Sequence, residues 1–151
     1  MICLEVVIRE ARPEDLFYIV EIEEKTFGLD AFGFNYLFYL FEHCRDFFLI
    51  ADYKGVLVGY VVSCLESSDE LHVHSIAVVD WFRGRGVGRK LMEETIRVAR
   101  ARGIKRVRLE VKTENTAAIT LYEKLGFERK NVLRNYYADG SDAYLYLLNL
   151  G

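Results

Sequence analysis

The sequence contains no apolar run that approaches the length of a membrane-spanning helix, so we expect no membrane partner. Residues 1–8 are too few for a signal peptide and are interrupted by Glu5. No linker, repeat or low-complexity segment divides the chain, and its 151 residues suit one domain with a buried core. We therefore expect a cytoplasmic protein with a single domain over residues 1–151.

Cysteine is scarce as well. Cys3, Cys44 and Cys64 are odd in number, widely separated, and form no C-x-x-C pair. This usage argues against a disulfide framework or a zinc site and favours reduced thiols in a cytosolic protein.

The chain also lacks an excess of basic charge. Its 20 basic and 23 acidic side chains give a net charge of −3. A chain that binds nucleic acid over its whole surface is usually basic, so we expect no direct contact with nucleic acid. The positive charge that is present is local and lies at residues 83–90.

Apolar periodicity and turn residues predict an alternating order of strands and helices. The expected strands are 5–10, 47–52, 56–65, 70–79, 106–112, 127–132 and 144–148. The expected helices are 13–26, 35–44, 86–102 and 115–125, and the only proline lies in the first turn of the first helix, where its missing N–H is tolerated. The order β-α-α-β-β-β-α-β-α-β-β predicts a mixed α/β sandwich.

The stretch from Ser75 to Met92 reads as a buried strand, a glycine loop and an amphipathic helix. The loop contains alternate glycines and arginines, namely Arg83, Gly84, Arg85, Gly86, Gly88 and Arg89. Glycines let a ligand approach the backbone, and the first N–H groups of a helix attract anions. Arginines add charge-assisted hydrogen bonds to phosphate oxygens. We therefore predict a pyrophosphate site here.

Several nucleotide-binding patterns compete for this loop. A Walker A loop requires Gly-Lys-Ser/Thr, but Gly88 is followed by Arg89 and Lys90. A dinucleotide fingerprint requires a third glycine where Arg89 stands. A glycine-rich turn with surface arginines would need no ligand at all. The pattern Arg-x-x-Gly-x-Gly, filled by Arg83, Gly86 and Gly88, resembles the acyl-CoA-binding loop of the GNAT superfamily of N-acetyltransferases.

A second stretch adds specificity. Residues 109–111 and 115–127 resemble the C-terminal part of protein N-terminal acetyltransferases, both the ribosomal-protein alanine branch and the archaeal relatives of the NatA catalytic subunit. Residues 136–144 are similar to the aromatic substrate loop of the second branch. The resemblance covers the whole chain and implies a GNAT fold, with a mixed, mostly antiparallel central sheet flanked by about four helices. It also implies direct attack of a protein or peptide α-amino group on acetyl-CoA in a ternary complex.

Glu110 is the candidate general base. A free α-amino group has a pKa of about 8, so a modest base can deprotonate it. Strand alternation places Glu110 opposite Val107, Leu109 and Val111, toward a cleft. The resemblance assigns the matching glutamate the role of base, acting through water. A structural glutamate paired with Arg108 is the alternative.

Three further residues could assist catalysis. Tyr122 lies seven residues after Asn115 on the same helix face, and the resemblance implies that it protonates the CoA thiolate; a core tyrosine is the alternative. Asn115 could cap the helix, bind the pantetheine arm, or do both. His72 shares a strand face with His74 and could help Glu110, although a structural histidine fits equally well. Two histidines are too few for zinc, so we expect no metal.

The resemblance carries over two sets of binding residues. The residues that would contact acetyl-CoA are Ile76, Ala77, Val78, Arg83, Arg85, Gly86, Val87, Gly88, Arg89, Asn115 and Tyr122. A main-chain N–H near Val78 would donate a hydrogen bond to the oxyanion, if the strand there separates from its neighbour. The substrate N-terminus would contact Phe27, Asp30, Tyr136 and Tyr137. Residues 27–30 lack the Leu-Pro-Glu or Phe-Pro-Trp of the two branches, and Asp30 could replace the missing glutamate. The preferred first residue of the substrate therefore stays open.

Two alternatives remain at this point. The protein could acetylate a small amine, such as a polyamine or amino acid, with the same co-substrate. It could instead be a non-catalytic acyl-CoA-binding module that acts through a larger partner. A ribosomal protein or the ribosome as partner, and a monomeric or dimeric state, are expectations from the resemblance alone.

Overall fold

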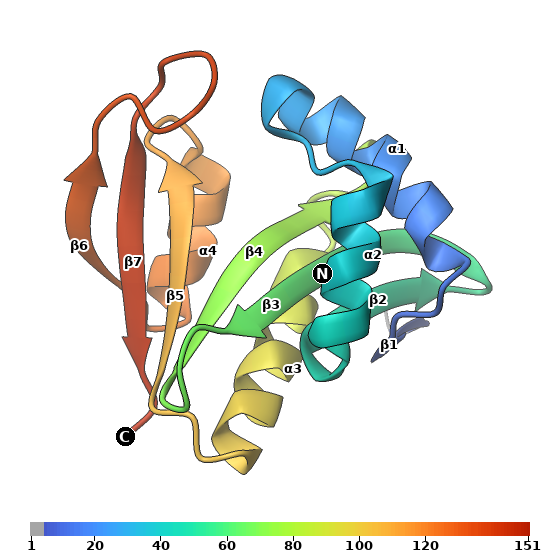
Figure 1. Ribbon diagram of the computed structural model, residues 1–151, viewed down its shortest axis with the longest axis horizontal. Coiled ribbons are helices and arrows are strands. Elements are labelled where there is room, and N and C mark those ends of the chain that lie inside the picture. Colours follow the sequence, from blue (N-terminus) through green and yellow to red (C-terminus); the bar gives the residue numbers. More distant parts are fainter. Residues whose placement is uncertain (1–4) are drawn as a thin grey trace.

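A computed structural model describes residues 5–151 and contains one seven-stranded sheet, flanked by four α-helices (Figure 1). The strands are β1 (Val6–Glu10), β2 (Phe48–Tyr53), β3 (Val56–Leu65), β4 (Glu70–Val78), β5 (Arg106–Lys112), β6 (Glu128–Leu133) and β7 (Ala143–Asn149). The α-helices are α1 (Asp15–Phe27), α2 (Phe34–His43), α3 (Val87–Ala101) and α4 (Thr116–Lys124). The predicted order of elements and the predicted α/β class are confirmed.

The sheet separates in its middle. Its strand order is β1-β2-β3-β4-β5-β7-β6, and every neighbouring pair is antiparallel except β4 and β5. These two parallel strands pair only from Glu70–His72 to Arg106–Arg108. Beyond His72 they diverge, and Figure 1 shows β4 leaning away from β5. An opening therefore lies between the two halves of the sheet.

Two apolar clusters lie on opposite faces of the sheet. Helices α3 and α4 pack on one face, where Leu91 and Val107 belong to the larger cluster. Helices α1 and α2 cover the other face of β2 to β4, where Leu16 and Tyr60 belong to the second cluster. A Cβ atom at Gly59 would lie 3.0 Å from the Ala77 carbonyl oxygen and 3.3 Å from the Val87 side chain, so glycine in β3 permits α3 to approach the sheet.

A β-bulge in β4 changes which face its side chains occupy. Pairing with β3 passes from Val62 with Ser75 to Ser63 with Val73, which leaves His74 without a partner in the ladder. Before the bulge, Val73 packs in the α3 cluster; after it, Ala77 packs in the α1–α2 cluster. Bulges re-aim side chains in this way and are common beside active sites.

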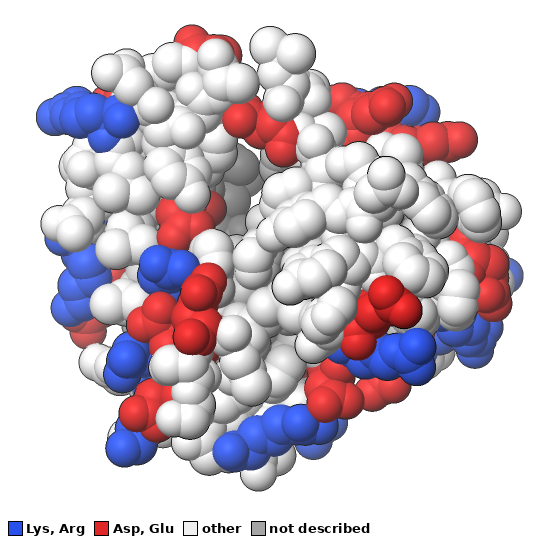
Figure 2. Space-filling model, in the orientation of Figure 1, with Lys and Arg blue, Asp and Glu red and all other residues white. Residues whose placement is uncertain are grey.

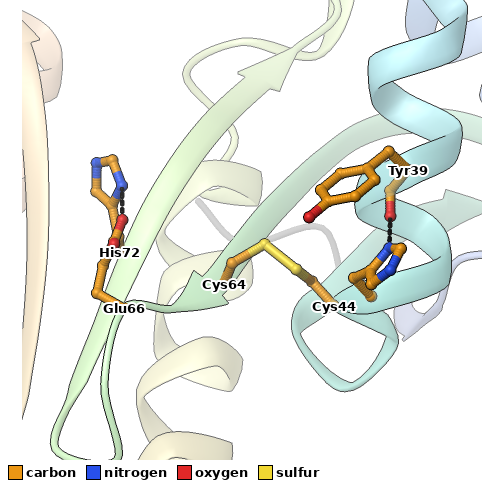
Figure 3. Close-up of a disulfide and its surroundings, with 6 residues drawn as sticks. Tyr39, Cys44, Cys64, Glu66 and His72 are labelled. Atoms are coloured by element: carbon orange, nitrogen blue, oxygen red, sulfur yellow. Dashed lines mark hydrogen bonds and ion pairs between the residues drawn. A yellow bond between two sulfur atoms is a disulfide. The ribbon is translucent and has the colours of Figure 1, made fainter.

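The expectation of reduced thiols was wrong for two of the three cysteines. Cys44, directly after α2, and Cys64, in β3, form a disulfide across a sequence separation of 20 (Figure 3). The pair forms because α2 packs on the sheet, which a sequence pattern does not reveal. Cys3 lies outside the described residues. No helix in the described part of the chain is long and apolar enough to cross a membrane.

We predict that one thiol per chain reacts with a thiol reagent when the protein is purified and denatured without reductant. The sequence has three cysteines, and the disulfide removes two of them. After reduction, three thiols should react. Three reactive thiols before reduction would contradict the Cys44–Cys64 bond.

We also predict that Asp15→Asn lowers the free energy of unfolding by about 1–3 kcal/mol at pH 7. The Asp15 carboxylate accepts hydrogen bonds from Arg9 Nη1 at 2.8 Å and from the Arg12 N–H at 2.7 Å. Burial raises the pKa of Asp15, but these hydrogen bonds outweigh burial and hold the pKa below its ordinary value. A depressed folded-state pKa stabilises the protein above the unfolded-state pKa, and this stability is lost as pH falls through the folded-state pKa.

Urea unfolding at pH 7 and at successively lower pH measures this difference. The gap between Asp15→Asn and wild type should shrink in acid, and a constant gap would contradict the assignment. Glu5→Gln is the control, because the ion pair of Glu5 with Lys54 is exposed and should contribute less than about 1 kcal/mol.

Candidate active site

A cavity of about 440 Å³ lies where β4 and β5 separate. Figure 2 shows the hollow between the β5–β7 side of the molecule and the α1–α2 side. Its wall is formed by α1, the α1–α2 loop, β4, β5, α4 with its N-cap and the β6–β7 loop. Among its lining residues are Phe27, Asp30, Ile76, Glu110, Asn115, Tyr122, Tyr136 and Tyr137, all named from the sequence.

Glu110 points into this cavity from β5. Its strand neighbours Leu109 and Val111 are buried in the core on the other face, as alternation predicted. One Glu110 carboxylate oxygen lies 2.6 Å from His72 Nε2, and the other lies 3.7 Å from Arg108 Nε. The Glu110 side chain is 10% exposed. The predicted meeting of Glu110 and His72 across adjacent strands is confirmed, and Arg108 is a second partner.

His72 connects two carboxylates. Its Nε2 faces Glu110, and its Nδ1 lies 3.0 Å from Glu66 Oε1, on the solvent side. The Glu66 side chain is 45% exposed. The ring of His74 lies 4.6 Å from that of His72, centroid to centroid. Burial, together with the neighbouring His72, lowers the pKa of His74, so His74 is neutral at pH 7.

Tyr122 and Asn115 approach the cavity from α4. Tyr122 is 5% exposed, and burial raises the pKa of its phenol, which therefore stays protonated at neutral pH. Asn115 is the N-cap of α4, and its Oδ1 accepts a hydrogen bond from the Ala118 N–H at 3.2 Å. The predicted cap is confirmed, and the same residue also lines the cavity.

The start of α3 has the features of an anion site. Gly86 is its N-cap with φ of 81°, no side chain caps the helix, and Val87 and Gly88 begin the first turn. Directly after β4, the Val79 N–H donates to the Val58 carbonyl of β3 at 2.9 Å. Because N–H groups alternate along a strand, the Val78 N–H points the other way, toward the opening. The Ala77 side chain packs in the α1–α2 cluster, which leaves only its main chain for a ligand.

The three arginines of the glycine loop contact protein groups at the surface. Arg83 donates to the Val78 carbonyl at 3.1 Å and pairs with Asp80 at 2.9 Å. Arg89 pairs with Glu93 at 3.3 Å, and the Arg85 guanidinium lies 4.9 Å from the Phe82 ring centroid. Such exposed contacts are weak, so the side chains can turn to a phosphate at little cost.

Two loops meet over the cavity. The Asp30 carboxylate, in the α1–α2 loop, accepts a hydrogen bond from the Ala138 N–H of the β6–β7 loop at 3.0 Å. Tyr136 and Tyr137 of the second loop pack edge to face, with centroids 5.0 Å apart. Lys112 holds that loop through Asp139 at 3.2 Å. Asp30 therefore connects the two loops that were expected to hold the substrate.

Glu23 is a residue of the site that the sequence interpretation did not single out. It is 1% exposed, and its carboxylate accepts hydrogen bonds from the Tyr60 hydroxyl, the Ser75 hydroxyl at 2.5 Å and the Phe32 N–H at 2.9 Å. It therefore anchors the α1–α2 loop to β3 and β4. A signal existed: Glu23 follows Leu16 and Ile19 at i+7 and i+4, on the apolar face of α1.

An opening beside an uncapped helix, with a carboxylate, a histidine and a buried phenol near it, suits an enzyme that moves an acyl group from a phosphate-bearing carrier. The chain belongs to the acetyltransferase (GNAT) family, whose family model matches residues 8–127. It is an N-acetyltransferase, and acetyl-CoA is its co-substrate.

Individual relatives agree with this assignment. An N-alpha-acetyltransferase of Sulfurisphaera tokodaii is 37% identical, over 91% of this chain and 89% of that protein. The crystal structure of Ard1 from Thermoplasma volcanium has a TM-score of 0.92 and 31% identity, over 98% of this chain and 99% of that one. The structure of Chaetomium thermophilum Naa20 in complex with a bisubstrate analogue has a TM-score of 0.85 and 25% identity, over 95% of this chain and 86% of that one.

We predict that Glu23→Gln lowers the free energy of unfolding by about 1–3 kcal/mol, because an amide N–H₂ would replace one acceptor among three converging donors. Urea denaturation measures the loss. Tyr60→Phe, which removes a single donor, should cost less. An equal or smaller loss for Glu23→Gln would show that the Glu23 carboxylate does not organise this network.

Proposed function

We propose that the protein transfers the acetyl group of acetyl-CoA to the α-amino group of protein or peptide N-termini. The observation that carries the proposal is the cavity between β4 and β5, whose lining brings Glu110 and Tyr122 together with the aromatic β6–β7 loop. Both substrates can meet there in a ternary complex, so the amine attacks the thioester directly. The description of the Sulfurisphaera relative as an N-alpha-acetyltransferase supports this choice of substrate.

Glu110 acts as the general base in this proposal. The ammonium of the substrate loses a proton to Glu110, directly or through water, before the free amine attacks the carbonyl carbon. His72, 2.6 Å from Glu110, can then pass the proton toward Glu66 and solvent. A base of this kind typically contributes about 10² to 10⁴ in rate.

Collapse of the tetrahedral intermediate completes the reaction. Its oxyanion accepts a hydrogen bond from the Val78 N–H, which the separation of β4 from β5 leaves free of a strand partner. The C–S bond breaks, and Tyr122 protonates the departing CoA thiolate. Burial suits Tyr122 to this role because it keeps the phenol protonated at neutral pH.

The acyl donor would lie along β4 and the start of α3. Main-chain groups of residues 76–78 hold the acetyl-pantetheine arm, with Asn115 on the opposite wall. The diphosphate lies at the N–H groups of Gly86, Val87 and Gly88, where the partial positive charge of the helix favours it. Arg83, Arg85 and Arg89 neutralise the remaining charge.

The substrate N-terminus would enter under the two loops. Phe27, Tyr136 and Tyr137 provide aromatic walls on both sides of the cavity, and Asp30 keeps the loops together. Aromatic walls on both sides of a cavity suit an extended peptide better than a small amine. We further propose that residues 1–151 form one domain, that the protein works in the cytoplasm as a monomer or dimer, and that a ribosomal protein is a natural source of the substrate.

We predict that Glu110→Gln lowers kcat by about 10² to 10⁴ and leaves the KM for acetyl-CoA nearly unchanged, because the amide keeps the shape but cannot accept the proton. Steady-state rates with saturating peptide measure the effect. The control is Glu114→Gln, the same change at an exposed position four residues further on, which should keep wild-type turnover. An unchanged kcat in Glu110→Gln would remove Glu110 from the mechanism.

The substrate class is tested with a library of peptides that differ in their first two residues, together with polyamines and free amino acids. Mass spectrometry identifies which amines gain an acetyl group. We expect acetylation of peptide α-amino groups, with a preference for particular first residues. Turnover of a small amine with no peptide acetylated would overturn the proposed substrate.

A further inference from the structure

Three metal-ligating side chains meet at the rim of the active site. Glu66 lies in the β3–β4 hairpin, and His72 and His74 lie in β4. One ligand atom of each lies within 4.8 Å of the other two. Glu66 is exposed, and both histidines are half-buried. Figure 3 shows His72 above Glu66, with a ring nitrogen toward the carboxylate. The bulge at His74 and the hairpin together create this arrangement.

The second nitrogen of His72 is already oriented for such a site. Its Nε2 lies 2.6 Å from Glu110, while Nδ1 faces Glu66 at 3.0 Å. Histidines that bind metals generally donate their other N–H to a carboxylate, which fixes the tautomer and increases the basicity of the ligating nitrogen. Glu110 can act as that outer carboxylate here, and an ion that displaces the proton between Nδ1 and Glu66 would bind the Nδ1 lone pair.

The position is open to an ion from solvent. The Glu66 side chain is 45% exposed. A second cavity of about 390 Å³, next to Cys44 and Cys64, is lined by both Glu66 and His74. A hydrated ion can therefore reach Glu66 and His74, and through Glu66 the adjacent His72 Nδ1, without entering the cavity that contains Tyr122 and Asn115.

We propose that Glu66, His72 and His74 bind one Zn²⁺ ion, and that this ion inhibits the enzyme. Two imidazoles and one carboxylate, with water as the fourth ligand, form a tetrahedral set that Zn²⁺ accepts, whereas Ca²⁺ and Mg²⁺ prefer oxygen ligands. The ion is an inhibitory ligand of this site and takes no part in acetyl transfer.

Inhibition follows from the position of Glu110. With zinc on His72 Nδ1, Nε2–H stays bonded to Glu110, and the ring can no longer pass a proton from Glu110 toward Glu66 and solvent. The ion also adds positive charge beside Glu110. The same charge repels the ammonium group of an incoming N-terminus. This consequence rests on the proposed function of Glu110, whereas zinc binding itself does not.

Calorimetric titration of the full chain with ZnCl₂ alone, without reductant or CoA, tests the binding. A Cys3→Ser background removes the remaining thiol. We expect one ion per chain, and a loss of affinity of about tenfold or more in His74→Asn and in Glu66→Gln. His43→Asn is the matched control, because His43 ends α2 and bonds the Tyr39 carbonyl instead. No binding, or equal loss in His43→Asn, would overturn the site.

Inhibition is measured separately, by mass spectrometry of the peptide product at fixed free Zn²⁺. Wild-type turnover should fall and should return when EDTA is added, and His74→Asn should require about tenfold more zinc for the same loss. Unchanged turnover at zinc concentrations that saturate the calorimetric site would overturn the inhibitory consequence. A metal-free protein that acetylates no peptide would count against the proposed function, and the calorimetry would still decide whether the site exists.

Discussion

The early end of pairing between β4 and β5 is the constraint on which the site depends. Parallel neighbours would normally continue their ladder, but here they stop after His72 and Arg108. A strand edge without a partner exposes N–H and C=O groups that must find another acceptor or donor, and a ligand can supply it. The same separation opens the cavity, frees the Val78 N–H and allows Glu110 to project between the two halves of the sheet.

Two glutamates in this region illustrate how partners determine role. Glu23 is almost fully buried and saturated by Tyr60, Ser75 and Phe32, so its carboxylate is committed to holding the α1–α2 loop. Glu110 has a histidine on one side and the cavity on the other, so its carboxylate stays accessible to a ligand, as the proposed role of general base requires. Burial alone does not distinguish them. The two glutamates differ instead in the number and type of hydrogen-bond donors around each carboxylate.

Connections between distant segments keep the walls of the site in place. Asp30 joins the α1–α2 loop to the β6–β7 loop, and the disulfide between Cys44 and Cys64 joins the end of α2 to β3. The first connection lies above the cavity, and the second lies beside Glu66 and His74. Precise positioning of reactive groups requires rigid support of this kind, because a displacement of about 1 Å can cost about 10² in rate.

The sequence by itself determined the order of elements, the glycine loop before α3, the cap at Asn115 and the cleft-facing side of Glu110. These features depend on local periodicity and on the chemistry of neighbouring residues, which a linear pattern records. Tertiary structure alone decided the pairing of Cys44 with Cys64, the three donors around Glu23, and the approach of Glu66 to the two histidines. Each arises from packing between segments far apart in the chain or from the single extra residue at His74, because one bulge reverses every side chain beyond it and leaves no mark on composition or spacing.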